Sequence, residues 1–185
     1  MQSLLHPLQY AQRLFYLNAA CVRDVPGQVD RSYIERMRDL IDGMKPGVKL
    51  ILLAFDYSYR EDAAVSPDTT SFHTPNEYAR RVAAAYPTHF EWAASVHPYR
   101  SDGVAALEQA RRDGARAVKW LPAAMGIDPA SPRCDAFYAA LAKLDLPLIT
   151  HGGMERAVNV GNQEFGNPLR LRRALEHGVR VVIAH

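Results

Sequence analysis

Cysteine and net charge are both scarce in this sequence. Cys21 and Cys134 are the two cysteines among 185 residues, too few for the disulfide framework of a small secreted domain. We therefore expect the reducing compartment of the cytoplasm. Lys and Arg number 22 while Asp and Glu number 20, which gives a formal net charge of +2. This balance gives no electrostatic reason to expect nucleic acid or an anionic membrane as a partner.

Long apolar runs are also missing. No segment approaches the ~20 residues that a membrane-spanning helix requires. The opening residues 1–22 are apolar enough to suggest a signal peptide, but they lack a basic start, and Gln9, Gln12 and Arg13 interrupt them. We interpret this segment as an amphipathic helix, with a frayed terminus as the alternative. Its apolar positions are Leu4, Leu5, Leu8, Leu14 and Phe15.

The sequence does contain five short apolar runs, spread over most of its length. Runs that are apolar at almost every position are typical of strands buried on both faces of a parallel sheet. The runs occupy residues 49–55, 92–96, 115–121, 146–150 and 179–184. The hydrophobic content of 48% is ordinary for a globular protein. The length fits a single domain over residues 1–185.

Helix start and stop signals lie between these runs. Ser32 with Glu35, and Thr74 with Glu77, have the spacing of a capping box, which favours a helix start. Strand and helix are therefore predicted to alternate, which indicates an α/β fold with a parallel sheet and right-handed crossovers. Further caps are predicted at Ser131–Pro132, Asn167–Pro168, Gly114 and Gly178.

Two architectures fit this alternation, an open doubly wound sheet and a (β/α)8 barrel. Residues 55–60 read Phe-Asp-Tyr-Ser-Tyr-Arg where a dinucleotide-binding domain would carry a glycine-rich turn, which argues against that class. Five strand–helix units fall about three short of a barrel, which usually needs ~250 residues. The chain also stops at His185, directly after a predicted strand. We therefore expect an incomplete piece of a longer chain.

An ionisable side chain lies near the carboxyl end of every predicted strand. In a barrel these ends converge on one mouth, where the chemistry takes place. An isolated histidine there is most often satisfied by the next loop, but three histidines and a lysine in matching positions favour a shared centre. Neutral imidazoles suit zinc or a similar divalent ion, which lowers the pKa of bound water to about 7 and generates a hydroxide nucleophile. The residues are Asp56, His97, Lys119, His151 and His185.

Lys119 is unusual because it lies inside the apolar run of residues 117–121. Desolvation penalises its charged form and is expected to lower its pKa. A neutral amine can take up CO2 as a carbamate and bridge two metals, whereas a charged amine can bind a substrate carboxylate. The structural alternative is a lysine whose stem packs against Trp120 while its ammonium group reaches solvent.

Further candidates near the strand ends each have a structural alternative. Glu155 and Arg156 come shortly after the fourth predicted strand, where they either orient a substrate or form a surface ion pair. His97 is either a catalytic or ligating histidine or a hydrogen-bonded core histidine. Asp56 either contacts substrate or binds backbone amides of the next loop. The polar segment 57–73 is either a lid over the mouth or an ordered surface excursion.

Four strand-end stretches carry a resemblance when they are taken in order. They are Ser-Val-His-Pro-Tyr-Arg at 95–100, Ala-Val-Lys-Trp-Leu-Pro at 117–122, Leu-Ile-Thr-His-Gly-Gly at 148–153 and Val-Val-Ile-Ala-His at 181–185. Over residues 48–185 the sequence resembles the amidohydrolase-related family of the metal-dependent hydrolase superfamily. The resemblance implies a distorted (β/α)8 TIM-like barrel, present here as a part with five parallel strands, and a mono- or binuclear metal centre at its mouth.

Residue by residue, the resemblance implies that His151 is a metal ligand and that His185 is a second ligand or a catalytic histidine. Lys119 matches the strand position that is a carbamylated bridge in binuclear members. The family carries a His-x-His pair on its first strand and an Asp on its last. The sequence shows neither, and His6 stands alone near its start. We therefore expect this piece to be inactive by itself, while the parent protein is an enzyme.

The leading functional prediction is a metal-dependent hydrolase that directs activated water at a small-molecule substrate, with zinc as the expected metal and manganese as an alternative. A metal-dependent decarboxylase of a small carboxylic acid is the first alternative, because the same family pattern hosts that chemistry. A non-catalytic degenerate barrel is the second, because the first-strand pair is missing. A five-stranded barrel section also leaves both outer strands unpaired, so we expect aggregation or homo-oligomers.

Overall fold

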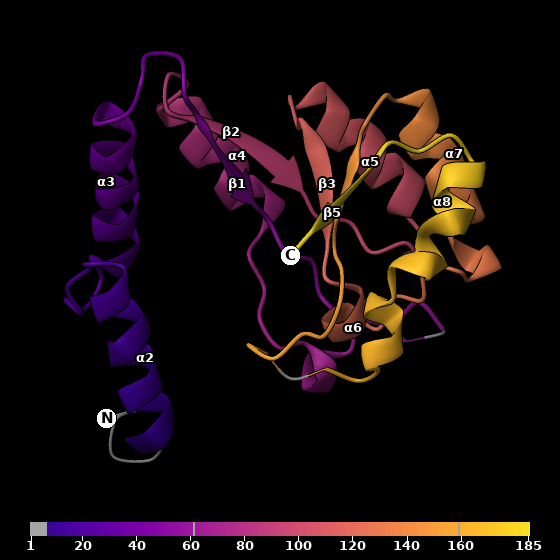
Figure 1. Ribbon diagram of the computed structural model, residues 1–185, viewed down its shortest axis with the longest axis horizontal. Helices are drawn as coiled ribbons and strands as arrows, with labels where there is room; N and C mark the ends of the chain where they lie inside the picture. Colours follow the sequence, from indigo (N-terminus) through magenta and orange to yellow (C-terminus); the bar gives the residue numbers. More distant parts are fainter. Residues whose placement is uncertain (1–6, 61, 159) are drawn as a thin grey trace. The chain divides into compact units, whose positions relative to one another are not determined.

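The computed structural model describes residues 7–60, 62–158 and 160–185 (Figure 1). It divides the chain into two compact units, Met1–Lys49 and Leu50–His185. The sequence predicts a single domain, but the alternating strand–helix pattern belongs entirely to the second unit. All the candidate site residues lie in that unit as well.

Helices α2 (Pro7–Ala19) and α3 (Val29–Asp42) make up most of the described part of the first unit. The amphipathic helix expected at the start of the chain is therefore present from residue 7 onward. Leu4, Leu5 and His6 lie outside the described residues. Among the helices of the described ranges, none is both long and apolar enough to cross a membrane.

Neither predicted capping box forms. Helix α3 begins at Val29, so Ser32 lies within its first turn and not in front of it. At the start of α4 (Asn76–Ala85), Pro75 takes the capping position and no side chain caps the helix, which leaves Thr74 outside. Both helices form where the sequence predicts them, but their first residues differ from those that the capping boxes predict.

The sheet of the second unit has five parallel strands that follow one another in sequence order, β1-β2-β3-β4-β5. A doubly wound sheet reverses its strand order at a switch point, whereas a barrel adds each strand beside the previous one. The observed order is that of a barrel section, so the predicted α/β partial barrel is confirmed. The strands are β1 (Leu50–Leu53), β2 (Phe90–Ala94), β3 (Ala117–Trp120), β4 (Leu148–His151) and β5 (Val181–Ala184).

Helices pack against one face of this sheet, and the hydrophobic core lies between them and the central strands (Figure 1). Val118 and Trp120 of β3 and Leu148 of β4 are fully buried there. The Trp120 ring lies 5.1 Å from the ring of Phe137 in α7. The remaining helices are α5 (Gly103–Arg112), α6 (Pro122–Met125), α7 (Asp135–Lys143) and α8 (Arg172–Glu176), with short 3-10 helices η1 (Pro67–Thr69), η2 (Pro132–Cys134), η3 (Gln163–Gly166) and η4 (Pro168–Leu171).

The other face of the sheet is more open. Side chains alternate along a strand, and register partners in parallel strands share a face. By this rule Ile51 and Leu53 of β1 and Val182 of β5 project away from the helices. Their exposed fractions are 43%, 38% and 51%. The same register places Lys119 and His151 on this open face.

The other predicted caps agree with the structure. Ser131 and Asn167 accept backbone N–H hydrogen bonds at the starts of η2 and η4. Gly114 and Gly178 follow α5 and α8 with φ of +87° and +78°, the left-handed conformation that ends a helix at low cost in glycine. Each of these glycines turns the chain back toward the next strand.

Candidate active site

Lys119 and His151 project from the same face of the sheet, close to the carboxyl ends of adjacent strands. Lys119 of β3 pairs in register with Ile149 of β4. His151 lies two residues beyond Ile149 and is the last residue of β4, so its side chain leaves the same face one step nearer the mouth. The topology therefore brings together two of the predicted site residues.

His185 follows β5 and turns back toward His151. Ala184 is the register partner of His151, so regular alternation would direct the next side chain to the opposite face. The backbone of His185 instead has a φ of +75°. Its ring centroid lies 4.8 Å from that of His151, with the two planes tilted by 38°. The two imidazoles are thus adjacent at the carboxyl edge of the sheet.

The spacing of these two rings suits a shared metal ion. Zinc–nitrogen bonds of ~2.0–2.1 Å at a tetrahedral angle place two imidazole centroids about 5 Å apart. The rings of His151 and His185 match that spacing, with centroids 4.8 Å apart. Within residues 7–60, 62–158 and 160–185, however, no group of three or more His, Cys, Asp or Glu side chains is placed to hold a metal. The described residues can therefore supply two imidazole ligands and not a complete zinc site.

Glu155 is buried beside His151. One carboxylate oxygen, Oε2, lies 3.6 Å from His151 Nδ1. The other, Oε1, accepts a hydrogen bond of 2.6 Å from the backbone N–H of Ala157. Arg156 is exposed on the same loop, whereas Glu155 is 7% exposed. Of the two predicted substrate-binding neighbours, Glu155 therefore lines the site and Arg156 faces solvent.

Lys119 is 3% exposed and lies in the electrostatic reach of Glu155. Burial lowers the pKa of Lys119 below the ordinary lysine value, and the Glu155 carboxylate acts in the opposite direction. A lysine whose ammonium group reaches solvent does not agree with this burial. The Lys119 amine and the Glu155 carboxylate therefore interact on the sheet face that also carries His151.

Gln163 fixes the loop that carries Glu155, a contact that the sequence pattern does not reveal. The Gln163 amide oxygen accepts a 3.0 Å hydrogen bond from the Glu155 backbone N–H, and its Nε2 donates a 2.6 Å bond to the Glu155 carbonyl. The loop closes where Gly153 N–H donates to the Gly166 carbonyl at 2.8 Å. A Cβ at residue 166 would collide with the Gly153 carbonyl oxygen, so a side chain there would open this closure.

His97 uses both ring nitrogens inside the protein. Its Nε2 donates a 3.0 Å hydrogen bond to the Met125 carbonyl, and its Nδ1 accepts a 3.2 Å bond from the Tyr99 backbone N–H. The side chain is fully buried. Burial lowers the pKa of His97 to about 4, so the ring is neutral near pH 7. These contacts do not support the predicted catalytic role and correspond to the core-histidine alternative.

Asp56 anchors the chain where β1 and β2 end. Its Oδ1 accepts a 2.9 Å hydrogen bond from the Tyr57 backbone N–H. Its Oδ2 accepts a 3.0 Å bond from the His97 backbone N–H and forms a 2.9 Å ion pair with Arg100 Nη1. Both carboxylate oxygens are therefore engaged within the protein. These contacts correspond to the backbone-amide alternative and do not support a substrate-binding Asp56.

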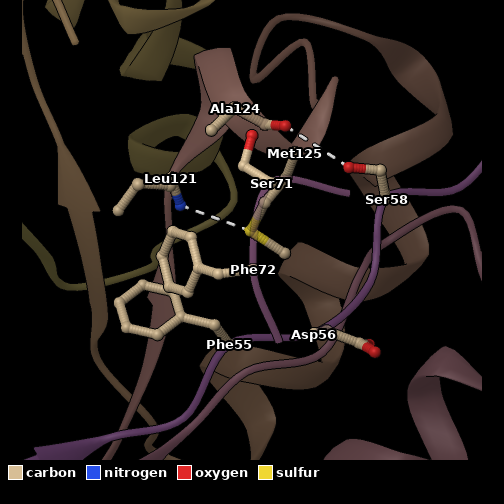
Figure 2. Close-up of a pocket in the computed structure, with 8 residues that line it drawn as sticks. All are labelled: Phe55, Asp56, Ser58, Ser71, Phe72, Leu121, Ala124 and Met125. Atoms are coloured by element: carbon tan, nitrogen blue, oxygen red, sulfur yellow. Dashed lines mark hydrogen bonds between the residues drawn. The ribbon is translucent and has the colours of Figure 1, made fainter. Parts of the chain in front are cut away.

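A small pocket lies between the segment after β1 and helix α6 (Figure 2). The Ser58 hydroxyl donates a 3.3 Å hydrogen bond to the Ala124 carbonyl, which ties segment 57–73 to α6. This segment is thus attached at its base, as the ordered-excursion alternative requires. The pocket is lined by Phe55, Asp56, Ser58, Ser71, Phe72, Leu121, Ala124 and Met125.

A family model described as amidohydrolase matches residues 56–185 of the chain. The match begins just after β1, so it covers β2 to β5 and all the site residues discussed above. A search of curated proteins finds no significant match to the chain.

Proposed function

The chain belongs to the amidohydrolase family, and from this membership we propose that it functions in the metal-dependent hydrolysis of a small molecule. The observation that carries the proposal is the pair of imidazoles from His151 and His185, 4.8 Å apart at the carboxyl edge of the sheet. A buried carboxylate, that of Glu155, lies next to His151, and the buried amine of Lys119 lies within electrostatic reach of this carboxylate. Barrel enzymes carry out their chemistry at this edge.

His151 and His185 would hold a divalent ion, with zinc favoured by the imidazole donors and manganese as the alternative. When bound, such an ion supplies Lewis acidity and lowers the pKa of water at the site. The Glu155 carboxylate faces His151 from the side of Nδ1. Lys119, as an ammonium group beside Glu155, would bind an anionic oxygen of the substrate. Two imidazoles form a small donor set, so weak metal binding is expected of these residues.

Metal titration tests the assignment of the two histidines. The zinc affinity of the chain, measured by calorimetry near pH 7.5, is expected to fall at least about tenfold in His151→Asn and in His185→Asn. His177→Asn is the matched control, because His177 lies beside Asp135 after α8 and is expected to change the affinity less than about twofold. A wild-type chain that binds neither zinc nor manganese would contradict the proposal and favour the non-catalytic barrel.

Product analysis separates hydrolysis from decarboxylation. With carboxylated candidate substrates in isotopically labelled water, a hydrolase incorporates one oxygen from water into a product. Release of CO2 without net addition of water would contradict the hydrolase and support the decarboxylase. The measurement should use protein that has been loaded with the metal.

A further inference from the structure

We infer that Glu155, locked in place by Gln163, is a positioning residue that sets the tautomer and orientation of His151. The inference deepens the proposed function, on which it rests where metal binding is concerned. Its geometric basis is the 3.6 Å approach of Glu155 Oε2 to His151 Nδ1, made by a carboxylate that is 7% exposed. The family match does not assign this role.

The direction of the effect follows from the chemistry of a neutral imidazole, which carries its proton on one of two nitrogens. A carboxylate can only accept, so a carboxylate facing Nδ1 favours the tautomer with the proton on Nδ1. The lone pair is then left on Nε2, which can coordinate a metal or accept a proton from the substrate. At 3.6 Å the contact is longer than a hydrogen bond. Glu155 therefore acts through its charge, which is screened little in a buried site.

The contacts of Glu155 leave one oxygen for this task. The backbone N–H of Ala157 takes Oε1 at 2.6 Å, which turns Oε2 toward His151. The Gln163 side chain binds the N–H and the carbonyl of Glu155 at once, at 3.0 and 2.6 Å. Gln163 therefore fixes the backbone of Glu155, while the Ala157 N–H fixes its side chain. Lys119 lies within electrostatic reach of the Glu155 carboxylate.

Nitrogen NMR on the metal-free chain tests the inference directly. Long-range proton–nitrogen spectra of histidine-labelled protein at about pH 8 distinguish the two tautomers of a neutral ring, and His151→Asn identifies the resonances of His151. We expect the Nδ1–H form to predominate in the wild type. Glu155→Met should shift the ring to the Nε2–H form, and Gln163→Met should give an intermediate population. Glu164→Met, which removes an exposed carboxylate from the same loop, should change nothing.

The outcomes are distinct for the inference and for the proposed function. A predominant Nε2–H form in the wild type overturns the inference even if no variant folds, as does an unchanged tautomer in Glu155→Met. Zinc affinity is expected to fall ~10–100-fold in Glu155→Met and less than twofold in Glu164→Met. An unchanged affinity in Glu155→Met overturns the positioning role. If the wild type binds no zinc while the tautomer responds as expected, the orientation by Glu155 is supported and the proposed function fails.

Discussion

At the scale of single residues, the same strand-end position leads to two different environments. His151 and His185 meet at the carboxyl edge, whereas His97 is enclosed by backbone groups of Met125 and Tyr99. The carbonyl that engages His97 comes from α6, a helix 28 residues away in sequence. Strand ends can be predicted from apolar runs, but the contacts that a distant segment makes there cannot. The pattern therefore identifies the residues at the mouth without showing which of them remain open.

The burial of His97 predicts a pH dependence of stability. Folding lowers the pKa of His97 from its ordinary value of 6.5 to about 4, so between these pH values the unfolded chain binds one proton more than the folded chain. The neutral His97 ring therefore favours the folded chain fully above pH 6.5. As the pH falls toward 4, the free energy of unfolding decreases by about 3 kcal/mol from this source. Urea unfolding of the wild type and of His97→Gln at several pH values measures it. The difference between the two proteins should shrink on acidification, and a constant difference would refute the neutral buried ring.

Asp56 and Asp102 provide a matched pair around Arg100. Both bind its guanidinium, at 2.9 and 2.7 Å, but the side chain of Asp56 is 5% exposed and that of Asp102 is 59% exposed. Asp56→Asn weakens a buried ion pair and should lower the free energy of unfolding by ~2–4 kcal/mol. Asp102→Asn should cost less than about 1 kcal/mol, because water replaces an exposed partner. Equal losses in chemical denaturation would show that Asp56 does not anchor the two strand ends.

At the scale of elements, strands are more predictable than helix starts. Each observed strand overlaps an expected apolar run. Continuous apolar runs are typical of strands buried on both faces, whereas the outer strands β1 and β5 each expose apolar side chains on the open face. A capping box matches two residues only, so it cannot exclude an earlier start such as Val29 in place of Ser32. The two hydrogen bonds between the Gln163 side chain and the Glu155 backbone leave no periodic pattern in the sequence, because they join one side-chain amide to the backbone of another residue.

The loop after β4 predicts different tolerances at two of its glycines. A Cβ at Gly166 would collide with the Gly153 carbonyl, whereas nothing lies within 4 Å of one at Gly161. Gly166→Ala should therefore cost ~1–3 kcal/mol of stability. Gly161→Ala should change it by less than about 0.5 kcal/mol. Both changes restrict the unfolded chain alike, so their difference in urea unfolding isolates the collision. Faster hydrogen exchange at the Gly153 amide in Gly166→Ala would locate the damage, and equal stabilities would contradict the tight closure.

At the scale of the whole sheet, one face is packed by helices and the other is open. The fold class follows from the alternation of strand and helix, and the strand order then distinguishes a barrel section from a doubly wound sheet. The open face carries Lys119 and His151 together with the exposed apolar residues Ile51 and Val182. Which side chains share this face depends on the register between strands, which no local pattern specifies.

The outer strands of this sheet predict self-association. In the described part of the chain β1 and β5 each pair with one neighbour, and Ile51 and Val182 on them are 43% and 51% exposed. Apolar strand edges favour pairing between molecules, and a lysine on an edge strand opposes it. The double variant Ile51→Lys/Val182→Lys should therefore lower the sedimentation coefficient and remove its rise with concentration. Leu169→Lys/Leu175→Lys adds the same charge at exposed leucines of η4 and α8, outside the sheet, and should leave the association in place. Wild-type protein that sediments as one monomeric species at every concentration would contradict the prediction, because the exposed edges would then be protected by means other than pairing.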